Sequence, residues 1–136
     1  MTNRQMYISL AVKDVKKSIA FFTKLGFTFN KQFTGKNSAC MIINKGNSVM
    51  FVAEKLFKTF TKKKIVDAKK NVEVGLTVQL SSRKNVDMVQ AKAIKAGGKA
   101  PAKPTDLGWM YTKDFDDLDG HSWGFTFIDA KKIPKN

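Results

Sequence analysis

The sequence of 136 residues is poor in the residue types that crosslink a small protein or bind a metal. Cys40 is the only cysteine, so no disulfide forms within the chain, and His121 is the only histidine, which excludes a histidine-rich metal cluster. No apolar run is long enough to cross a bilayer, and the polar N-terminus lacks the layout of a signal peptide. We therefore expect a cytoplasmic protein with no membrane partner.

Arginine is also scarce, although the chain is strongly basic. The 25 basic residues outnumber the 11 acidic ones and give a net charge of +14, yet Arg4 and Arg83 are the only arginines. Proteins that recognise bases or phosphates specifically favour arginine, because its planar guanidinium group donates paired hydrogen bonds. The charge therefore indicates a solvated, lysine-rich surface and no specific nucleic-acid partner. A non-specific binder of anions or nucleic acid is the alternative.

Apolar residues make up 43% of the chain, enough for a core, and they recur in two similar patterns. In the first half, residues 6–12 alternate as a strand, Asp14 is placed to cap a helix, and Gly26 is placed to end it. Three further strands are expected at 27–33, 38–44 and 48–53.

The second half repeats this order after a basic connector. In the connector, Leu56, Phe57 and Phe60 have helical spacing and either cover the sheet edge or form a lid over a pocket. A strand at 73–80, a helix between Ser82 and Gly97, and strands at 99–104, 109–115 and 122–128 follow. We expect one domain over 1–136, with modules at 5–54 and 72–130 and the connector at 55–71.

The last strand has two unlike faces. After the turn at Asp119-Gly120, the large side chains of Trp123, Phe125 and Phe127 alternate with Ser122, Gly124 and Thr126. The large face is expected to pack on a helix, and the small face is expected to line a site.

Several short segments carry a resemblance to a known family: Leu10 to Asp14, Ser18 to Phe22, Leu25 to Phe27 and Phe115 to Trp123, with Phe57 to Thr61 and Ala96 to Gly98 typical of one branch of it. With the internal repeat, they make the chain resemble the vicinal oxygen chelate superfamily, in its glyoxalase-like branch. That superfamily includes glyoxalase I, bleomycin resistance proteins, extradiol dioxygenases and fosfomycin resistance proteins. The resemblance implies an α+β fold in which duplicated βαβββ modules form a cupped mixed sheet, and it implies a homodimer.

In metal-using members, four inner-strand positions converge on the ion. The resemblance places them at Tyr7, Met50, Glu73 and Gly124. Only Glu73 is a good ligand for a hard divalent ion, since Met50 offers a soft thioether and Gly124 has no side chain. We therefore expect no metal and no other cofactor, and a metalloenzyme with a non-standard ligand set is the alternative.

Other chemistry is sparse. His121 is interpreted as a structural residue of the turn, and Cys40 as a buried, inert thiol. The acidic residues Asp114, Asp116, Asp117 and Asp119 do not match a calcium loop and are interpreted as a solvated, hydrogen-bonded turn. Catalytic residues are unassigned, with Glu73 the best candidate either for a base or for a salt bridge to a lysine.

The expected function is the binding of a small neutral or anionic molecule, and catalysis is left open. Aromatic and thioether walls with a few polar groups are typical of a ligand cleft. The expected pocket is lined by Tyr7, Ser9, Met50, Glu73, Trp109, Tyr111 and Gly124, with Phe57 or Phe60 beside them. The alternative activities are those of a lyase, a thiol transferase or a dioxygenase.

Overall fold

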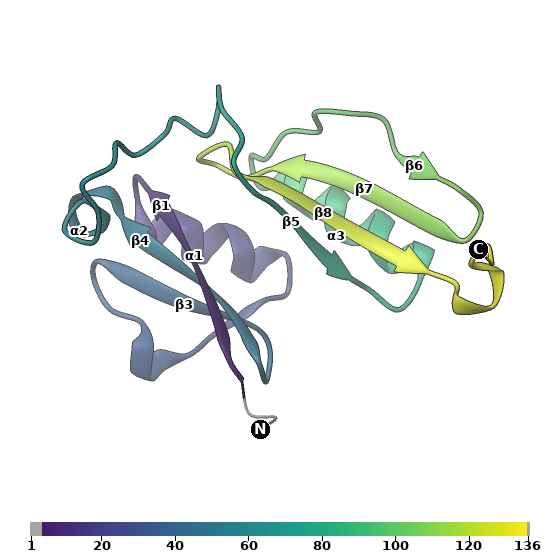
Figure 1. Ribbon diagram of the computed structural model, residues 1–136, viewed down its shortest axis with the longest axis horizontal. Helices are drawn as coiled ribbons and strands as arrows, with labels where there is room; N and C mark the ends of the chain where they lie inside the picture. Colours follow the sequence, from purple (N-terminus) through teal and green to yellow (C-terminus); the bar gives the residue numbers. More distant parts are fainter. Residues whose placement is uncertain (1–3, 136) are drawn as a thin grey trace. The chain divides into compact units, whose positions relative to one another are not determined.

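The computed structural model describes residues 4–135 and divides the chain into two compact units. Unit 1 is Met1–Val66 and unit 2 is Asp67–Asn136, so the boundary falls inside the expected connector. Each unit contains a four-stranded mixed sheet and one longer helix (Figure 1). The duplicated α+β arrangement predicted from the sequence is confirmed.

Unit 1 has the strand order β1-β4-β3-β2, in which β1 and β4 are parallel and the other pairs antiparallel. Its elements are β1 (Met6–Val12), α1 (Val15–Lys24), β2 (Thr28–Phe29), the 3-10 turn η1 (Lys31–Phe33), β3 (Ser38–Asn44), β4 (Asn47–Ala53) and α2 (Glu54–Phe57).

Unit 2 repeats the topology as β5-β8-β7-β6, with β5 and β8 parallel. Its elements are β5 (Gly75–Gln79), α3 (Arg83–Lys95), β6 (Thr105–Asp106), β7 (Met110–Asp116), β8 (Ser122–Ile128) and the 3-10 turn η2 (Ala130–Lys132).

In each unit the core lies between the sheet and its longer helix. Asp14 caps α1 by accepting a hydrogen bond from the Lys17 backbone N–H, as predicted, and Phe22 of α1 stacks on Phe51 of β4 at 4.8 Å between ring centroids. In unit 2, Phe115 stacks between Trp123 and Phe125, and all three are buried. Buried aromatic pairs of this kind are worth about 0.5–1.5 kcal/mol beyond the burial of their area.

Two predicted strands are much shorter than expected. The strand at 27–33 is limited to Thr28–Phe29, because the Asn30 side chain accepts from the Gln32 N–H at 3.0 Å and begins η1. The strand at 99–104 is reduced to a single bridge between Lys99 and Asp116. The prolines that follow cannot donate ladder hydrogen bonds, so pairing resumes only at β6.

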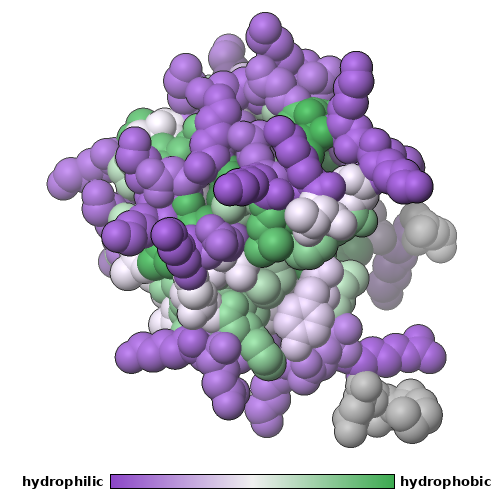
Figure 2. Space-filling view, turned by 90° about the vertical axis from the view of Figure 1, so that its left-hand side faces the viewer, coloured by the Kyte–Doolittle hydropathy of each residue, from purple (hydrophilic) through white to green (hydrophobic). Residues whose placement is uncertain are grey.

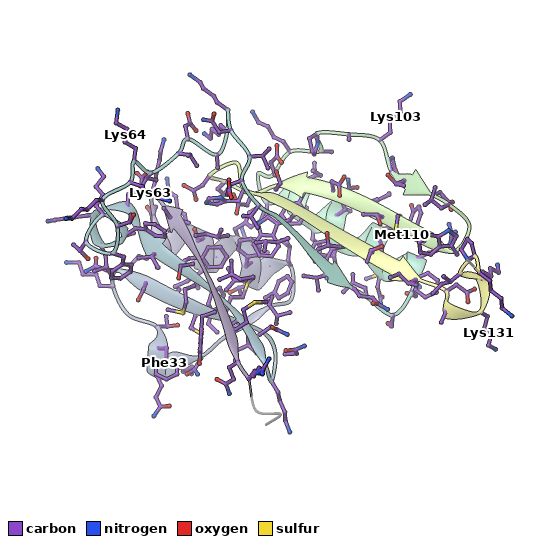
Figure 3. All side chains as sticks on the ribbon, viewed as in Figure 1. Phe33, Lys63, Lys64, Lys103, Met110 and Lys131 are labelled. Atoms are coloured by element: carbon purple, nitrogen blue, oxygen red, sulfur yellow. The ribbon has the colours of Figure 1, made fainter. Side chains whose placement is uncertain are left out.

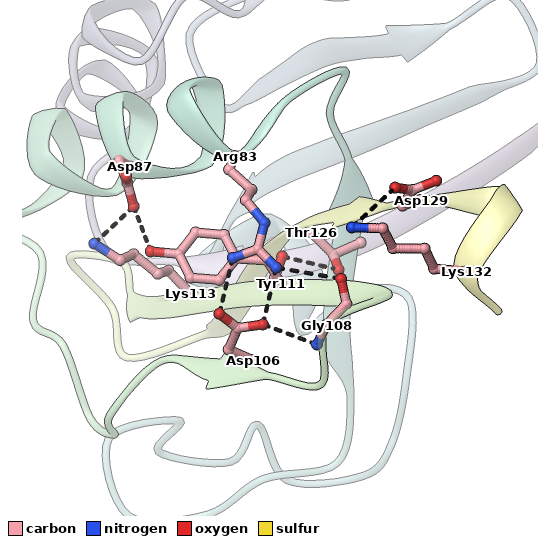
Figure 4. A network of polar contacts seen from close by, with 9 residues as sticks. All are labelled: Arg83, Asp87, Asp106, Gly108, Tyr111, Lys113, Thr126, Asp129 and Lys132. Atoms are coloured by element: carbon pink, nitrogen blue, oxygen red, sulfur yellow. Dashed lines mark hydrogen bonds and ion pairs between the residues drawn. The ribbon is translucent and has the colours of Figure 1, made fainter. Parts of the chain in front are cut away.

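A salt bridge attaches the edge strand β6 to the start of α3 (Figure 4). The Arg83 guanidinium donates to both Asp106 carboxylate oxygens, at 2.8 and 2.9 Å, and lies over the Tyr111 ring at 4.7 Å from its centroid. Hydrogen bonds from Arg83 and then from the Gly108 backbone lower the pKa of Asp106 from 3.8 to about 2.

This pKa gives a first prediction. A lowered folded-state pKa means that the stabilisation by Asp106 is complete above the unfolded value of 3.8 and is lost as the pH falls through about 2. In an NMR titration of the side-chain carboxyl carbon, Asp106 should have a midpoint near 2, and Arg83→Gln should return it toward 3.8. A wild-type midpoint at the ordinary value would show that the salt bridge does not form in solution.

Candidate functional site

The small face of β8 lines a cavity of about 220 Å³ in unit 2. The strand register pairs Gly124 with Thr77 of β5 and with Asp114 of β7, so the three residues lie on the sheet face opposite the aromatic core. This confirms that the two faces of β8 have different roles. The cavity is lined by Gly75, Leu76, Thr77, Pro101, Asp114, Phe115, Asp116, Ser122, Trp123 and Gly124.

The carboxylate of Asp114 occupies the space that a side chain at position 124 would need. A Cβ added to Gly124 would lie 2.8 Å from Asp114 Oδ1 and 3.5 Å from Thr77 Oγ1. A Cβ atom essentially never lies within 3.0 Å of a heavy atom to which it is not connected by bonds. Residue 124 contributes no side chain, and the Asp114 carboxylate of β7 lies beside its backbone in the cavity wall.

Asp114 was missed by the sequence analysis, which placed it with Asp116 in a solvated turn. Both residues belong to β7, and both line the cavity. The available signal was that Asp114 and Gly124 lie five residues on either side of Asp119. A hairpin centred at that turn pairs them directly.

The cavity has a negative local charge in a basic protein. Burial raises the pKa of Asp116, the nearby Asp114 raises it further, and Lys99 opposes the rise. Among the residues that the structure describes, the Thr77 and Ser122 hydroxyls form no hydrogen bond and so remain available to a ligand. The cavity therefore offers carboxylate acceptors and hydroxyl groups that both donate and accept.

The turn that fixes this register is organised by Asp117. Its side chain is 7% exposed and accepts hydrogen bonds from the Asp119 N–H at 3.0 Å, the His121 N–H at 2.9 Å and the Trp123 indole N–H at 3.0 Å. Burial raises the pKa of Asp117, although His121 and the hydrogen-bond donors oppose the rise. The prediction of hydrogen-bonded aspartates is confirmed, but Asp117 is buried and not solvated.

In unit 1, three expected pocket residues share one sheet face. Ser9 and Met50 are register partners, and Tyr7 lies two residues before Ser9 on the same strand. Tyr7 is 50% exposed, and its hydroxyl donates to Gln5 Oε1 at 2.9 Å. Cys40 of β3 is the other register partner of Met50. It is 1% exposed, which confirms that it is buried.

Glu73 lies outside the strand that was expected to carry it. It is exposed and precedes β5, which begins at Gly75. Tyr7 pairs with Ser48 of β4, whereas Glu73 has no partner on β8, because the pairing of β5 with β8 begins at Gly75 and Ser122. The connector crosses the turn so closely that a Cβ on Gly120 would lie 2.6 Å from the Lys69 backbone nitrogen, and pairing with β8 starts only beyond this crossing.

Tyr111 and Trp109 do not line the cavity. Tyr111 lies on the α3 side of β7, where its hydroxyl donates to Asp87 Oδ1 at 2.6 Å (Figure 4). Trp109 precedes β7, and its carbonyl accepts from the Asp129 N–H at 2.8 Å. The alternation of β7 places Tyr111 opposite Phe127 on the core side, whereas Thr112 and Asp114 point to the cavity side.

The residues present do not fit the family's divalent metal at the four inner-strand positions. Gly124 has no ligand atom, Met50 is a thioether, and Glu73 precedes its strand. Within residues 4–135, no three His, Cys, Asp or Glu side chains gather as a metal-binding group.

The comparisons with known proteins agree with this fold. A family model described as the glyoxalase/bleomycin resistance protein/dioxygenase superfamily matches residues 4–125, and the chain belongs to this superfamily. Among proteins with curated descriptions, none matches the chain.

Solved structures of the same fold are numerous. A hypothetical protein from S. aureus is 27% identical, with a TM-score of 0.78 over 91% of this chain and 93% of that chain. A glyoxalase-related enzyme from Fulvimarina pelagi is 16% identical, with a TM-score of 0.78 over 93% of this chain and 88% of that one. A fosfomycin resistance protein from Listeria monocytogenes is 17% identical, with a TM-score of 0.67 over 100% and 97%. The last two likenesses show the fold alone.

Proposed function

We propose that this member of the superfamily binds a small neutral molecule in the unit 2 cavity without the family's metal. The observation that carries the proposal is the Asp114 carboxylate, which stands where a side chain of residue 124 would lie. A carboxylate accepts hydrogen bonds from hydroxyl or amide groups, and such charge-assisted bonds contribute about 1.5–3 kcal/mol. The homodimer expected from the resemblance remains part of this proposal.

The charges of the cavity narrow the expected ligand. The sequence alone allowed a neutral or an anionic molecule, but Asp114 and Asp116 both line the cavity and would repel an anion. A cation would be attracted by the carboxylates inside the cavity, but the net charge of +14 would repel it as it approached the protein. A neutral ligand with a hydrogen-bond donor satisfies both conditions.

The size of the cavity further restricts the class of ligand that we expect. About 220 Å³ is smaller than the roughly 300–1,000 Å³ of pockets that enclose a drug-sized ligand. The cavity therefore suits a single ring or a short polyol, or one end of a longer molecule. The hydroxyls of Thr77 and Ser122 are placed to orient its donor group toward Asp114.

Filling the cavity should abolish binding. Full-length protein would be screened by ligand-observed NMR against a fragment library of neutral alcohols, sugars and amides. Thr77→Phe places a large ring on the cavity wall and should weaken the affinity for fragments at least tenfold, and Asp114→Asn should weaken it about 10- to 100-fold. Thr105→Phe is the matched control, because Thr105 lies on the same sheet face but does not line the cavity.

Two results would contradict the proposal. One is a set of fragments whose affinities are the same in Thr77→Phe and in the wild type, which would place the binding site elsewhere. The other is tight, stoichiometric binding of Ni²⁺, Zn²⁺ or Mn²⁺ in calorimetry that Asp114→Ala or Glu73→Ala abolishes. That outcome would support the metalloenzyme alternative.

A further inference from the structure

Unit 1 carries most of the net positive charge of the protein, +11 against +3 for unit 2. Residues 1–66 contain thirteen lysines and arginines but only two acidic residues, Asp14 and Glu54, whereas residues 67–136 contain twelve basic and nine acidic residues. The three ion pairs found among residues 4–135 all lie in unit 2. The basic residues are divided almost evenly between the units, but the net charge is concentrated on unit 1 because it has so few acidic residues.

The highest local density of this charge is in residues 55–66, called here the basic segment. It contains Lys55, Lys58, Lys62, Lys63 and Lys64, all exposed. In the described part of the chain, none of these ammonium groups forms an ion pair. Lys63 and Lys64 extend away from the ribbon into solvent (Figure 3).

An exposed aromatic ring lies among these lysines. Phe60 is 62% exposed, and Val66, at the end of the segment, is 55% exposed. On the face shown in Figure 2, hydrophilic side chains surround patches of hydrophobic residues. Large apolar side chains rimmed by charge are typical of an interaction surface.

The backbone holds Phe60 in this position. α2 packs against β4 and β1, and the turn after it is closed by hydrogen bonds from the Lys58 N–H to the Glu54 carbonyl at 3.0 Å and from the Phe60 N–H to the Phe57 carbonyl at 2.9 Å. The Thr59 hydroxyl adds a bond to the Leu56 carbonyl at 2.7 Å. The ring is therefore presented on an ordered support, which lowers the entropy cost of inserting it into a partner.

We propose that the basic segment docks unit 1 onto an anionic lipid surface. Clustered lysines are attracted to acidic headgroups without needing a fixed geometry, and a neighbouring aromatic ring inserts at the boundary between headgroups and acyl chains. A surface that binds nucleic acid would favour arginine, whose guanidinium group hydrogen-bonds phosphates and bases. The only arginine in unit 1 is Arg4, which lies outside the basic segment. None of the described helices is long and apolar enough to cross a membrane, so the docking is peripheral.

The proposal is tested with the full-length protein and sedimented vesicles. Vesicles of phosphatidylcholine with about 30% phosphatidylserine should bind the protein, vesicles of phosphatidylcholine alone should not, and salt should weaken binding. Each lysine near the surface is worth about fivefold in affinity, so Lys62→Gln, Lys63→Gln and Lys64→Gln combined should lower it about 100-fold. Phe60→Ala should lower it by roughly 3- to 10-fold.

A matched control separates local docking from overall charge. Lys84→Gln, Lys92→Gln and Lys95→Gln combined remove the same charge from exposed positions on α3 of unit 2 and should change affinity less than threefold. An equal loss in both triple variants, or no binding to the acidic vesicles, would overturn the proposal. So would tighter binding to a single-stranded oligonucleotide than to the vesicles. Because the cavity variants lie in unit 2, the two proposals fail independently.

Discussion

Replacing Asp117 by alanine is expected to lower the free energy of unfolding of unit 2 by roughly 3 kcal/mol. The change removes the acceptor for the N–H groups of Asp119, His121 and Trp123, and the indole N–H lies in the buried core. Each buried donor left without a partner costs about 1–3 kcal/mol, and part of this cost is recovered when water reaches the turn. Urea denaturation followed by tryptophan fluorescence reports unit 2 specifically, because both tryptophans, Trp109 and Trp123, lie there.

An exposed aspartate provides the control. Asp87→Ala also removes one negative charge, an ion pair to Lys113 and a hydrogen bond from Tyr111, but its carboxylate lies on the surface of α3. Exposed pairs contribute little, so the expected loss is about 1 kcal/mol or less. Similar losses in the two variants would show that Asp117 does not organise the turn.

The direction in which the Asp117 carboxyl group makes the stability of unit 2 depend on pH follows from its pKa. Because burial raises the pKa of its carboxyl, the folded state holds the proton more tightly than the unfolded chain does. The cost of burying the charge therefore appears as the pH rises through the unfolded pKa, and it is complete above the raised folded value. The three N–H donors offset this cost, which is why removing the side chain is still expected to destabilise the unit.

Adding one methyl group at Gly124 is expected to destabilise unit 2 by roughly 1 kcal/mol, and only while Asp114 is present. The new Cβ would lie 2.8 Å from Asp114 Oδ1, so the Asp114 carboxylate must rotate away from its place beside Gly124. In an Asp114→Ala background, Gly124→Ala should instead stabilise by roughly 0.5–1 kcal/mol, because alanine loses less backbone entropy than glycine on folding. The coupling between the two substitutions should therefore be about 1.5–2 kcal/mol.

Gly75→Ala is the control for this cycle. No atom lies within 4 Å of a Cβ added there, so its effect should be the same with and without Asp114. Denaturation of the four variants of the cycle, and of Gly75→Ala in both backgrounds, measures the two coupling energies. Additive effects of Gly124→Ala and Asp114→Ala would show that the carboxylate does not occupy the space beside Gly124. The cavity proposal would then lose the observation that carries it.

The chemistry of the site depends on which strand supplies its carboxylate. One of the four positions taken from the resemblance is Gly124, which offers neither a ligand atom nor a carboxylate. In the folded unit, the antiparallel neighbour of that glycine supplies one. A carboxylate on β7 enters the cavity from a different backbone position than a side chain on β8. For this reason the expected role is to accept a hydrogen bond from a ligand, and not to complete a metal site.

Local patterns determined a large part of this protein from the sequence. Alternation and turn residues located β1 and β3, placed Asp14 as the cap of α1, and separated the aromatic face of β8 from its small face. Each depends on residues within a few positions of one another, because side-chain direction in a strand or helix repeats with a fixed period. The internal repeat then indicated the duplicated fold that the structure has.

Contacts between distant residues were decided only by the tertiary structure. Register placed Asp114 beside Gly124, left Glu73 without a partner on β8, and put Tyr111 on the helix side of its sheet. The division into units likewise revealed that most of the net positive charge belongs to residues 1–66. A periodic pattern tells which residues share a face of one strand, but pairing between strands depends on turns and crossings elsewhere in the chain, so neighbours across a sheet follow only from the folded structure.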